Sequence, residues 1–272
     1  MVLFDFSDYG QLLPLVQNSL IAGALLGLLG GLIGIFVMTR DMSFAVHGIS
    51  ELTFAGAAFA LLLGIDVLTG SVFGALAASL LIGVLGAKAR ERNSIVAVLM
   101  PFGLGLGILA LALYPGRAAN KFGLLTGQII AVDTPQLTSL IAIALVVIVA
   151  LMLIWRPLTF ASLDGEVAAA RGVPTRALSL GFVILLGLSV AVSVQIVGAL
   201  LVLSLLVTPA AAALRVTASQ LLAPILSVVF AVVSVVGGIL LSLGGGLPIS
   251  PYVTTISFLI YLICRVVERV RR

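Results

Sequence analysis

The chain has 272 residues, of which 62% are hydrophobic and only 9% are charged. Soluble domains are roughly half apolar and about one quarter charged, so this composition excludes an ordinary soluble protein and indicates a polytopic membrane protein. The net charge of +4 has the sign expected of a nucleic-acid binder, but the positions of the basic residues explain it otherwise, as described below. The single cysteine, Cys264, excludes an intrachain disulfide and a cysteine-pair metal site.

Nine apolar runs are long enough to cross about 30 Å of hydrocarbon as helices. The runs are continuous and lack the alternation of barrel strands, so we expect an all-α bundle that forms a single transmembrane domain over residues 1–272. No charged loop separates the sixth run from the seventh, near Gln195, and both eight and nine spans therefore stay open. The runs lie at about 17–39, 42–64, 67–87, 94–114, 135–155, 177–194, 196–214, 221–243 and 251–267.

The basic residues follow alternate spans, and this predicts the topology. The positive-inside rule assigns the side with more arginine and lysine to the cytoplasm. The N-terminus is then outside, the C-terminus is cytoplasmic, and the net charge requires no nucleic-acid partner. The stretch MVLFDFSDYG lacks a basic n-region, so we do not expect a cleavable signal peptide. One side carries Arg40, Lys88, Arg90, Arg92, Arg156, Arg171, Arg176, Arg215, Arg265, Arg269, Arg271 and Arg272, and the other carries only Arg117 and Lys121.

The cytoplasmic segment RPLTFASLDGEVAAARGVPTRAL contains the signals of a short helix near residues 163–172. Asp164 is a good N-cap, Glu166 places negative charge in the first turn, and Arg171 places positive charge in the last. Gly172 and Pro174 then end the helix. Two helical turns are unstable alone in water, so we expect the segment to rest on lipid or its own bundle, or to bind a partner protein.

Two missing motifs argue against an enzyme. Neither Lys88 nor Lys121 follows the glycine pattern of a phosphate-binding loop, so the chain is not expected to hydrolyse ATP. The chain has a single histidine, so the two-histidine motif H-E-x-x-H is absent. Because that histidine lies inside a span, no Ser-His-Asp arrangement is within reach.

That histidine, His47, precedes Glu51 by four residues in the stretch FAVHGISELTFAGAAF. A carboxylate at the centre of a membrane helix costs roughly 2.5–3.5 kcal/mol, so such a residue normally faces the protein interior and has a function. Residues i and i+4 share one helix face. An imidazole nitrogen and a carboxylate oxygen together suit zinc, manganese or ferrous iron, and they make up half of a metal site. The alternative is that the pair only makes polar contacts between helices.

Asp66 is the other acidic residue to consider. It is expected at the outer end of its span, where a carboxylate is tolerated. It could attract cations at the entrance of a pathway, or it could be an ordinary solvated loop residue.

Three stretches resemble one known family. RDMSFAVHGISELTFAGAAFALLLG resembles the signature span of the permease subunits of zinc- and manganese-type metal ABC importers, in which a metal-binding pair at i and i+4 precedes Pro-Gly. SLDGEVAAARGVPTRALSLGF resembles the coupling segment of that family, and SVQIVGALLVLSLLVTPAAAAL resembles its following spans. The resemblance covers nearly the whole chain.

The resemblance implies a role for each matching residue. His47 takes the first metal position, where the family has Asp or His, and Glu51 takes the second, where His is usual. Ala55 replaces the usual proline before Gly56. Histidine-rich pairs in the family suggest zinc and Asp/His pairs suggest manganese, and a His/Glu pair matches neither. The residues implied to contact the ATPase are Leu163, Asp164, Glu166, Ala170, Arg171 and Gly172.

The resemblance also implies an assembly. Two permease copies, most simply identical ones, or two related permeases, would lie in the bacterial plasma membrane. They would receive a divalent metal from an extracytoplasmic binding protein, with zinc as the first choice and manganese as the second. A separate ATPase subunit would hydrolyse ATP. The metal is cargo, and no permanently bound cofactor is expected.

Two alternatives remain. In the first, the chain is a secondary transporter or channel in which His47 and Glu51 relay protons or ions. In the second, it is an ABC permease for a metal chelate, which needs a wide cavity but no liganding side chains.

Overall fold

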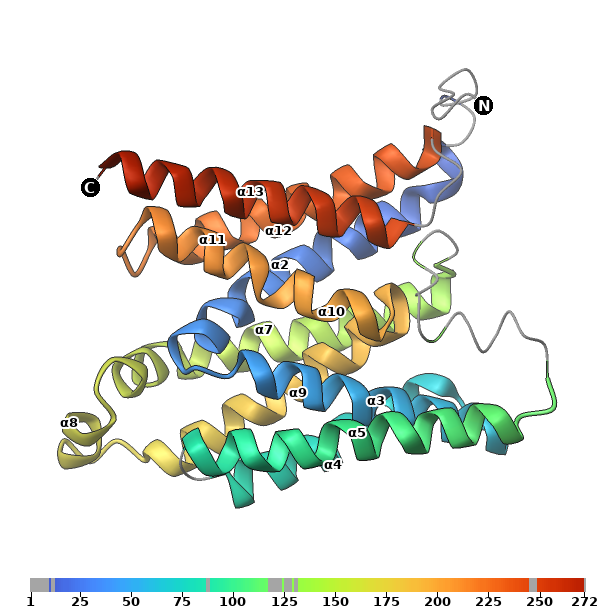
Figure 1. The fold of residues 1–272 in the computed structure, drawn as a ribbon, viewed down its shortest axis with the longest axis horizontal. Helices are drawn as coiled ribbons and strands as arrows, with labels where there is room; N and C mark the ends of the chain where they lie inside the picture. The colour runs from blue at the N-terminus through green and yellow to red at the C-terminus, as the bar shows by residue number, and fades with distance from the viewer. Residues whose placement is uncertain are drawn as a thin grey trace. The chain divides into compact units, whose positions relative to one another are not determined.

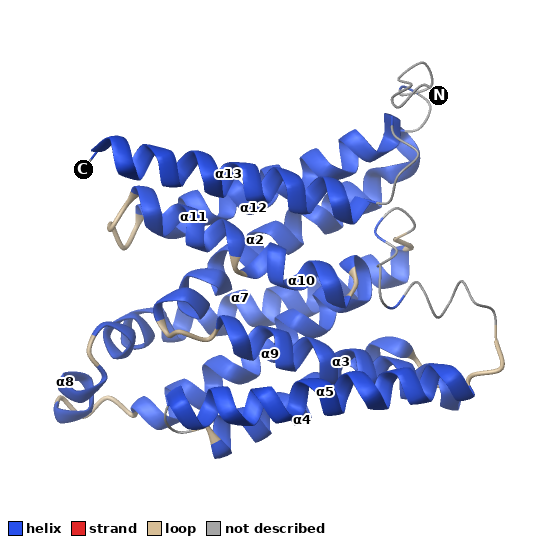
Figure 2. Ribbon diagram, viewed as in Figure 1, coloured by secondary structure: helices blue, strands red, loops and turns tan. Residues whose placement is uncertain are grey.

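The computed structural model describes residues 13–86, 89–116, 132–244 and 249–271 and the single positions 10, 124 and 129. Every regular element in these residues is a helix (Figure 2), and the prediction of an all-α protein is confirmed. Eight of the described helices are long and apolar enough to span a membrane. Lys88, Arg117, Lys121 and Arg272, which entered the topology prediction, lie outside the described residues.

Most helices follow the predicted apolar runs, but one is much longer than predicted. The helix predicted to end near residue 155 continues to Leu163 through Arg156 and Pro157, because Leu158 beyond them is fully buried. In chain order the elements are η1 (Leu13–Val16), α2 (Gln17–Thr39), α3 (Ser43–Leu63), α4 (Val67–Leu85), α5 (Ala89–Leu113), α7 (Thr134–Leu163), α8 (Gly165–Ala170), α9 (Thr175–Val197), α10 (Ala199–Leu206), α11 (Thr208–Val216), α12 (Leu222–Gly244) and α13 (Ile249–Arg271) (Figure 1).

The helices form two compact units, each built from segments that are far apart in the sequence. Unit 1 comprises Met1–Met38, Gln128–Ala142 and Leu203–Arg272. Within it, α11, α12 and α13 pack against one another. The Ser227 hydroxyl of α12 donates a 2.8 Å hydrogen bond to the Gly31 carbonyl of α2, where a glycine lets the two backbones approach closely. The single-domain prediction over 1–272 stays a prediction.

Unit 2 comprises Thr39–Gly127 and Ile143–Val202. Its central helix is α3, which packs against α4, α5 and α9. Most of the α3 side chains are buried as a result. The helix that carries the predicted metal pair is therefore the core element of its unit.

A break divides the sixth predicted span from the seventh. The sequence placed this boundary near Gln195, but α9 continues to Val197 and ends at Gly198, which has a φ of 80°. The seventh predicted run, at about 196–214, does not form one helix long enough to span the membrane. Instead, α10 stops at Leu206, and α11 begins at Thr208 with Pro209 in its first turn. Proline is tolerated there because the first helical N–H groups have no intrahelical partner.

The direction of the chain after this break can be tested by cysteine labelling. We predict that α10 and α11 together cross the membrane once. The charge pattern places Arg176 and Arg215 on the same side, which requires an even number of crossings between them, and α9 supplies only one. The exposed loop positions Ile65 and Leu221 serve as reporters in a Cys264→Ala background. A membrane-impermeant maleimide should label Ile65→Cys in intact cells and Leu221→Cys only in inverted vesicles. Labelling of both from outside would contradict the predicted crossing.

Candidate metal site and the helix near residues 163–172

The backbone of α3 is held on two sides near Glu51. A Cβ atom at Gly103 of α5 would meet Leu52 and the backbone of Glu51, and one at Gly74 of α4 would meet the backbone of Leu52. Glycine at these positions lets both neighbouring helices contact the α3 backbone directly. The position of the pair is thus fixed by packing.

The structure brings His47 and Glu51 together, as predicted from their spacing. His47 Nε2 lies 3.7 Å from Glu51 Oε1, and their side chains are 32% and 9% exposed. This separation is too long for a hydrogen bond. Two ligand atoms that each lie roughly 2.0–2.2 Å from one ion are about 3.0–3.5 Å apart, so a small side-chain adjustment would let both bind the same metal.

The second imidazole nitrogen is not held. His47 Nδ1 is buried and has no hydrogen-bond partner among the residues that the structure describes. A metal-binding histidine usually donates this N–H to a fixed acceptor, which orients the ring. The described residues supply no such acceptor for His47.

That the pair makes up half of a metal site stays a prediction. In the described part of the chain, no group of three His, Cys, Asp or Glu residues could hold a metal ion. The nearby hydroxyls already serve as donors, since Ser50 Oγ bonds to the Ala199 carbonyl at 3.1 Å and Thr53 Oγ1 to the Ile49 carbonyl at 2.7 Å. The described residues therefore offer a bound ion no third carboxylate, imidazole or thiolate beside this pair.

The bond from Ser50 also places the helix break beside the pair. Ala199 is the first residue of α10, and Ser50 is the neighbour of Glu51 on α3. Interrupted helices are tolerated at membrane depth only where their free backbone groups find protein or water partners. Sequence reasoning noted the uncertain boundary near Gln195 but could not connect it to α3, which lies about 150 residues earlier.

Asp66 lies away from the pair and has a local structural role. It is the N-cap of α4, and its Oδ2 accepts hydrogen bonds from Thr69 N at 2.8 Å and Thr69 Oγ1 at 2.9 Å. Twelve residues of α3 separate Glu51 from the end of that helix at Leu63, which is about 18 Å of helix. A role for Asp66 at an entrance stays a prediction.

The segment at residues 163–172 folds as its capping signals indicate. Asp164 Oδ1 accepts from Glu166 N at 3.1 Å and from Val167 N at 2.9 Å, and α8 follows over Gly165–Ala170. Arg171 is the C-cap, and Gly172 leaves the helix with a φ of 82°. Only Ala168 of α8 is buried, whereas Leu163 and Val167 are 66% and 45% exposed. The segment is thus a preformed helical turn with free apolar side chains.

A cluster that sequence reasoning missed connects this segment to α3. Arg40, at the corner between α2 and α3, donates to Ser162 Oγ at 3.1 Å and lies over the Phe182 ring at 5.8 Å. Burial, and secondarily the charge of Arg92, lower the pKa of Arg40 below its usual range. Ser162 lies two residues before the Asp164 cap, so the cluster joins the start of α3 to the start of the segment.

Arg92 of α5 completes the cluster, and its contribution can be measured. Its Nη2 donates to the backbone carbonyls of Arg40 at 3.1 Å and Asp41 at 3.0 Å. We predict that Arg92→Gln destabilises the protein by about 1–3 kcal/mol, because two carbonyl oxygens lose a charged donor. Denaturation by detergent, followed through the fluorescence of Trp155, the only tryptophan, measures this. Arg156→Gln is the control, since Arg156 is exposed on α7, and equal stability of the two variants would contradict the prediction.

Comparison with known proteins identifies the class. The profile of the ABC 3 transport family matches residues 13–268. The manganese transport system membrane protein MntC of Halalkalibacterium halodurans is 29% identical over 228 residues, 84% of this chain and 78% of that protein. The manganese import system permease protein ScaB of Streptococcus pneumoniae is 30% identical over 216 residues, 77% of this chain and 74% of that protein.

Solved structures show the same fold. PsaBC from Streptococcus pneumoniae in complex with Fab matches with a TM-score of 0.84 at 23% identity, covering 94% of this chain and 95% of that chain. The chain therefore belongs to the ABC 3 transport family and is a membrane-spanning permease subunit of a metal ABC transporter. It is a multi-pass protein of the bacterial membrane, and the resemblance seen in its sequence is confirmed.

Proposed function

We propose that this permease imports Mn²⁺, with His47 and Glu51 of α3 as part of the pathway that the ion follows. The observation that carries the proposal is the pair itself, an imidazole nitrogen and a carboxylate oxygen 3.7 Å apart in the core helix of unit 2. Ionisable side chains inside a membrane bundle mark ion pathways by default.

Manganese replaces zinc as the first choice of cargo. The family resemblance seen in the sequence favours zinc over manganese as the transported metal, whereas relatives such as MntC and ScaB are named for manganese. The ligand chemistry is compatible with this order, because carboxylate oxygens suit Mn²⁺ while imidazole also suits Zn²⁺. Glu51 in the second position supplies the oxygen ligand.

The properties of the segment at residues 163–172 support the rest of the proposed assembly. This chain has no phosphate-binding loop, so ATP hydrolysis belongs to a separate ATPase subunit. The exposed side chains of Leu163 and Val167 beside the capped helix α8 offer a small apolar surface to that subunit. A homodimer of permeases and an extracytoplasmic metal-binding protein complete the proposed importer.

Reconstitution tests the cargo. The permease, its ATPase and its binding protein are placed in proteoliposomes, and ATP-dependent accumulation of Mn²⁺ and of Zn²⁺ is measured in parallel. We expect Mn²⁺ to be taken up in preference to Zn²⁺. Preferential uptake of Zn²⁺ would reverse the order of the two metals. Uptake of neither free ion, together with uptake of a metal chelate, would replace the proposal by a chelate importer.

A further inference from the structure

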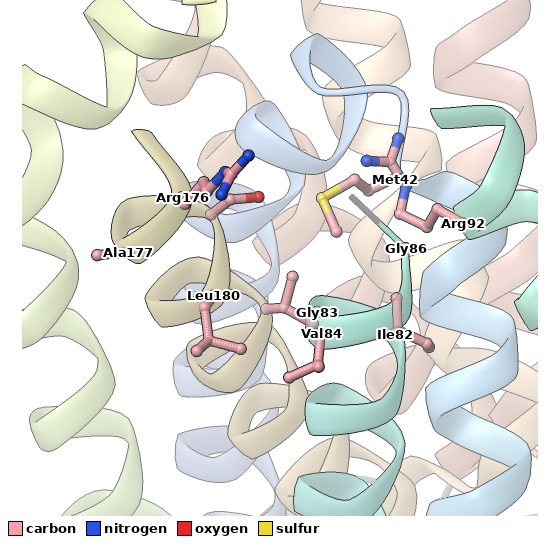
Figure 3. Close-up of a pocket in the computed structure, with 11 residues that line it drawn as sticks. Met42, Ile82, Gly83, Val84, Gly86, Arg92, Arg176, Ala177 and Leu180 are labelled. Atoms are coloured by element: carbon pink, nitrogen blue, oxygen red, sulfur yellow. The ribbon is translucent and has the colours of Figure 1, made fainter. Parts of the chain in front are cut away.

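A groove of about 570 Å³ lies in unit 2 between the last turn of α4 and the first turns of α9. Figure 3 shows Gly83 and Val84 of α4 facing Leu180 of α9, with Met42 and Arg92 on the other side. The volume is in the range of small-molecule sites. Neither His47 nor Glu51 lines this groove, so it is separate from the candidate metal site.

The groove is positively charged. Arg92 and Arg176 are the ionisable residues among those that line it, and no lining residue is acidic. Arg176 is exposed and makes no hydrogen bond or ion pair with any described residue. The Nε of Arg92 is buried and unpartnered in the same part of the chain. Asp41 lies close enough to interact with Arg92, but it does not line the groove.

These donors match a phosphate group. Guanidinium groups present several N–H donors in a planar fork and bind phosphate oxygens by charge-assisted hydrogen bonds. Arg92 and Arg176 come from different helices, α5 and α9. Nη2 of Arg92 already donates to the Arg40 and Asp41 carbonyls, so a phosphate would bind to Arg176 and to the remaining N–H groups of Arg92. The Ser179 side chain, which also lines the groove, supplies a further hydroxyl.

An apolar surface continues from the groove along α4. Phe73, Leu80 and Val84 are 70%, 46% and 66% exposed, and their spacing places them on one face of the helix. Val84 belongs both to this face and to the wall of the groove. A soluble phosphate needs no such surface, whereas acyl chains do, so the arrangement fits a phospholipid with its headgroup between the two arginines.

We propose that this groove binds the phosphate headgroup of an anionic phospholipid, whose acyl chains lie along the exposed face of α4. The charge pattern of the chain assigns this end to the cytoplasmic side, where anionic lipids give the membrane a negative surface potential. Basic pockets between membrane helices on that side are suited to anionic headgroups. The site lies beside the cluster of Arg40 and Arg92, so a bound lipid would support the same corner of unit 2.

Native mass spectrometry of the permease purified with its ATPase subunit tests the proposal. The complex is equilibrated with an equal mixture of phosphatidylglycerol and phosphatidylcholine, and the ratio of the two retained lipids is measured. We expect the wild type to retain phosphatidylglycerol preferentially and Arg176→Gln to lower the ratio about fivefold, the effect of one basic residue near an anionic surface. Arg156→Gln, which removes an equal charge outside the groove, should leave the ratio unchanged.

Three results would overturn the proposal. Equal retention of both lipids by the wild-type complex would show that the groove does not select an anionic lipid, or that the ATPase occupies it. An equal decrease in the ratio of phosphatidylglycerol to phosphatidylcholine in Arg176→Gln and Arg156→Gln would show that the net charge of the protein, and not the groove, determines lipid retention. Complete displacement of phosphatidylglycerol by soluble glycerol phosphate would identify a free phosphate ester as the ligand instead.

Discussion

Replacing Glu51 by Gln is expected to lower ATP-dependent Mn²⁺ uptake in proteoliposomes by about 10- to 100-fold or more, while the complex still assembles. The substitution keeps the shape of the side chain and removes only the charge that pairs with the metal. Changes to the outer shell of metal sites already cost about 10- to 100-fold in affinity or activity, and loss of a direct ligand costs at least as much. Uptake is measured beside the yield of the purified complex.

The matched control is Asp66→Asn, which also removes one carboxylate charge but lies at the N-cap of α4. We expect it to keep most of the uptake. Failure of Glu51→Gln to assemble would show that His47 and Glu51 are structural polar contacts. Full uptake by an assembled Glu51→Gln variant, and by His47→Ala, would show that the cargo does not bind at this pair.

Substituting Gly172 by Val is expected to reduce copurification of the ATPase subunit while the permease still inserts into the membrane. Gly172 has a φ of 82°, a conformation that costs an L-residue roughly 1–2 kcal/mol and a β-branched residue more. The segment must therefore leave its conformation at the end of α8. A penalty of this size corresponds to about a 5- to 30-fold loss, measured as ATPase recovered per permease.

Gly165→Ala provides the control within the same segment. A Cβ atom at Gly165 meets nothing within 4 Å, and its backbone is not left-handed. Alanine also favours the helix over glycine by about 1 kcal/mol, so binding of the ATPase should be unchanged or stronger. Normal complex formation by Gly172→Val would remove residues 163–172 from the proposed ATPase interface.

Local chemistry made part of this structure predictable. The Asp164 cap, the short helix α8 and the stop at Gly172 follow from side-chain preferences that act within a few residues, and the structure has them where the sequence predicts them. The proximity of His47 and Glu51 follows from helical periodicity alone. Composition fixed the helical class because unpaired backbone groups are not tolerated in hydrocarbon.

The remaining features depend on contacts between distant parts of the chain. Arg40 bonds to Ser162, which lies 122 positions later, and no local pattern predicts that partner. The break at Gly198 follows shortly after the boundary expected near Gln195, because no charged loop separates the two apolar runs there and hydropathy gives no sharp boundary. The orientation of the termini is set by the membrane and stays a prediction from charge.

The hydrogen bond from the Ser50 hydroxyl to the Ala199 carbonyl links α3 to the start of α10, just after the break that follows α9. The Ala199 carbonyl at the start of α10 has this hydroxyl as its partner at 3.1 Å, next to Glu51. The Ser50 hydroxyl is fully buried, and a buried donor that loses its acceptor costs about 1–3 kcal/mol. Any sliding of α3 along its axis must therefore either move the first turn of α10 with it or lose that amount. The bond therefore couples a movement of α3 near Glu51 to a movement of the first turn of α10.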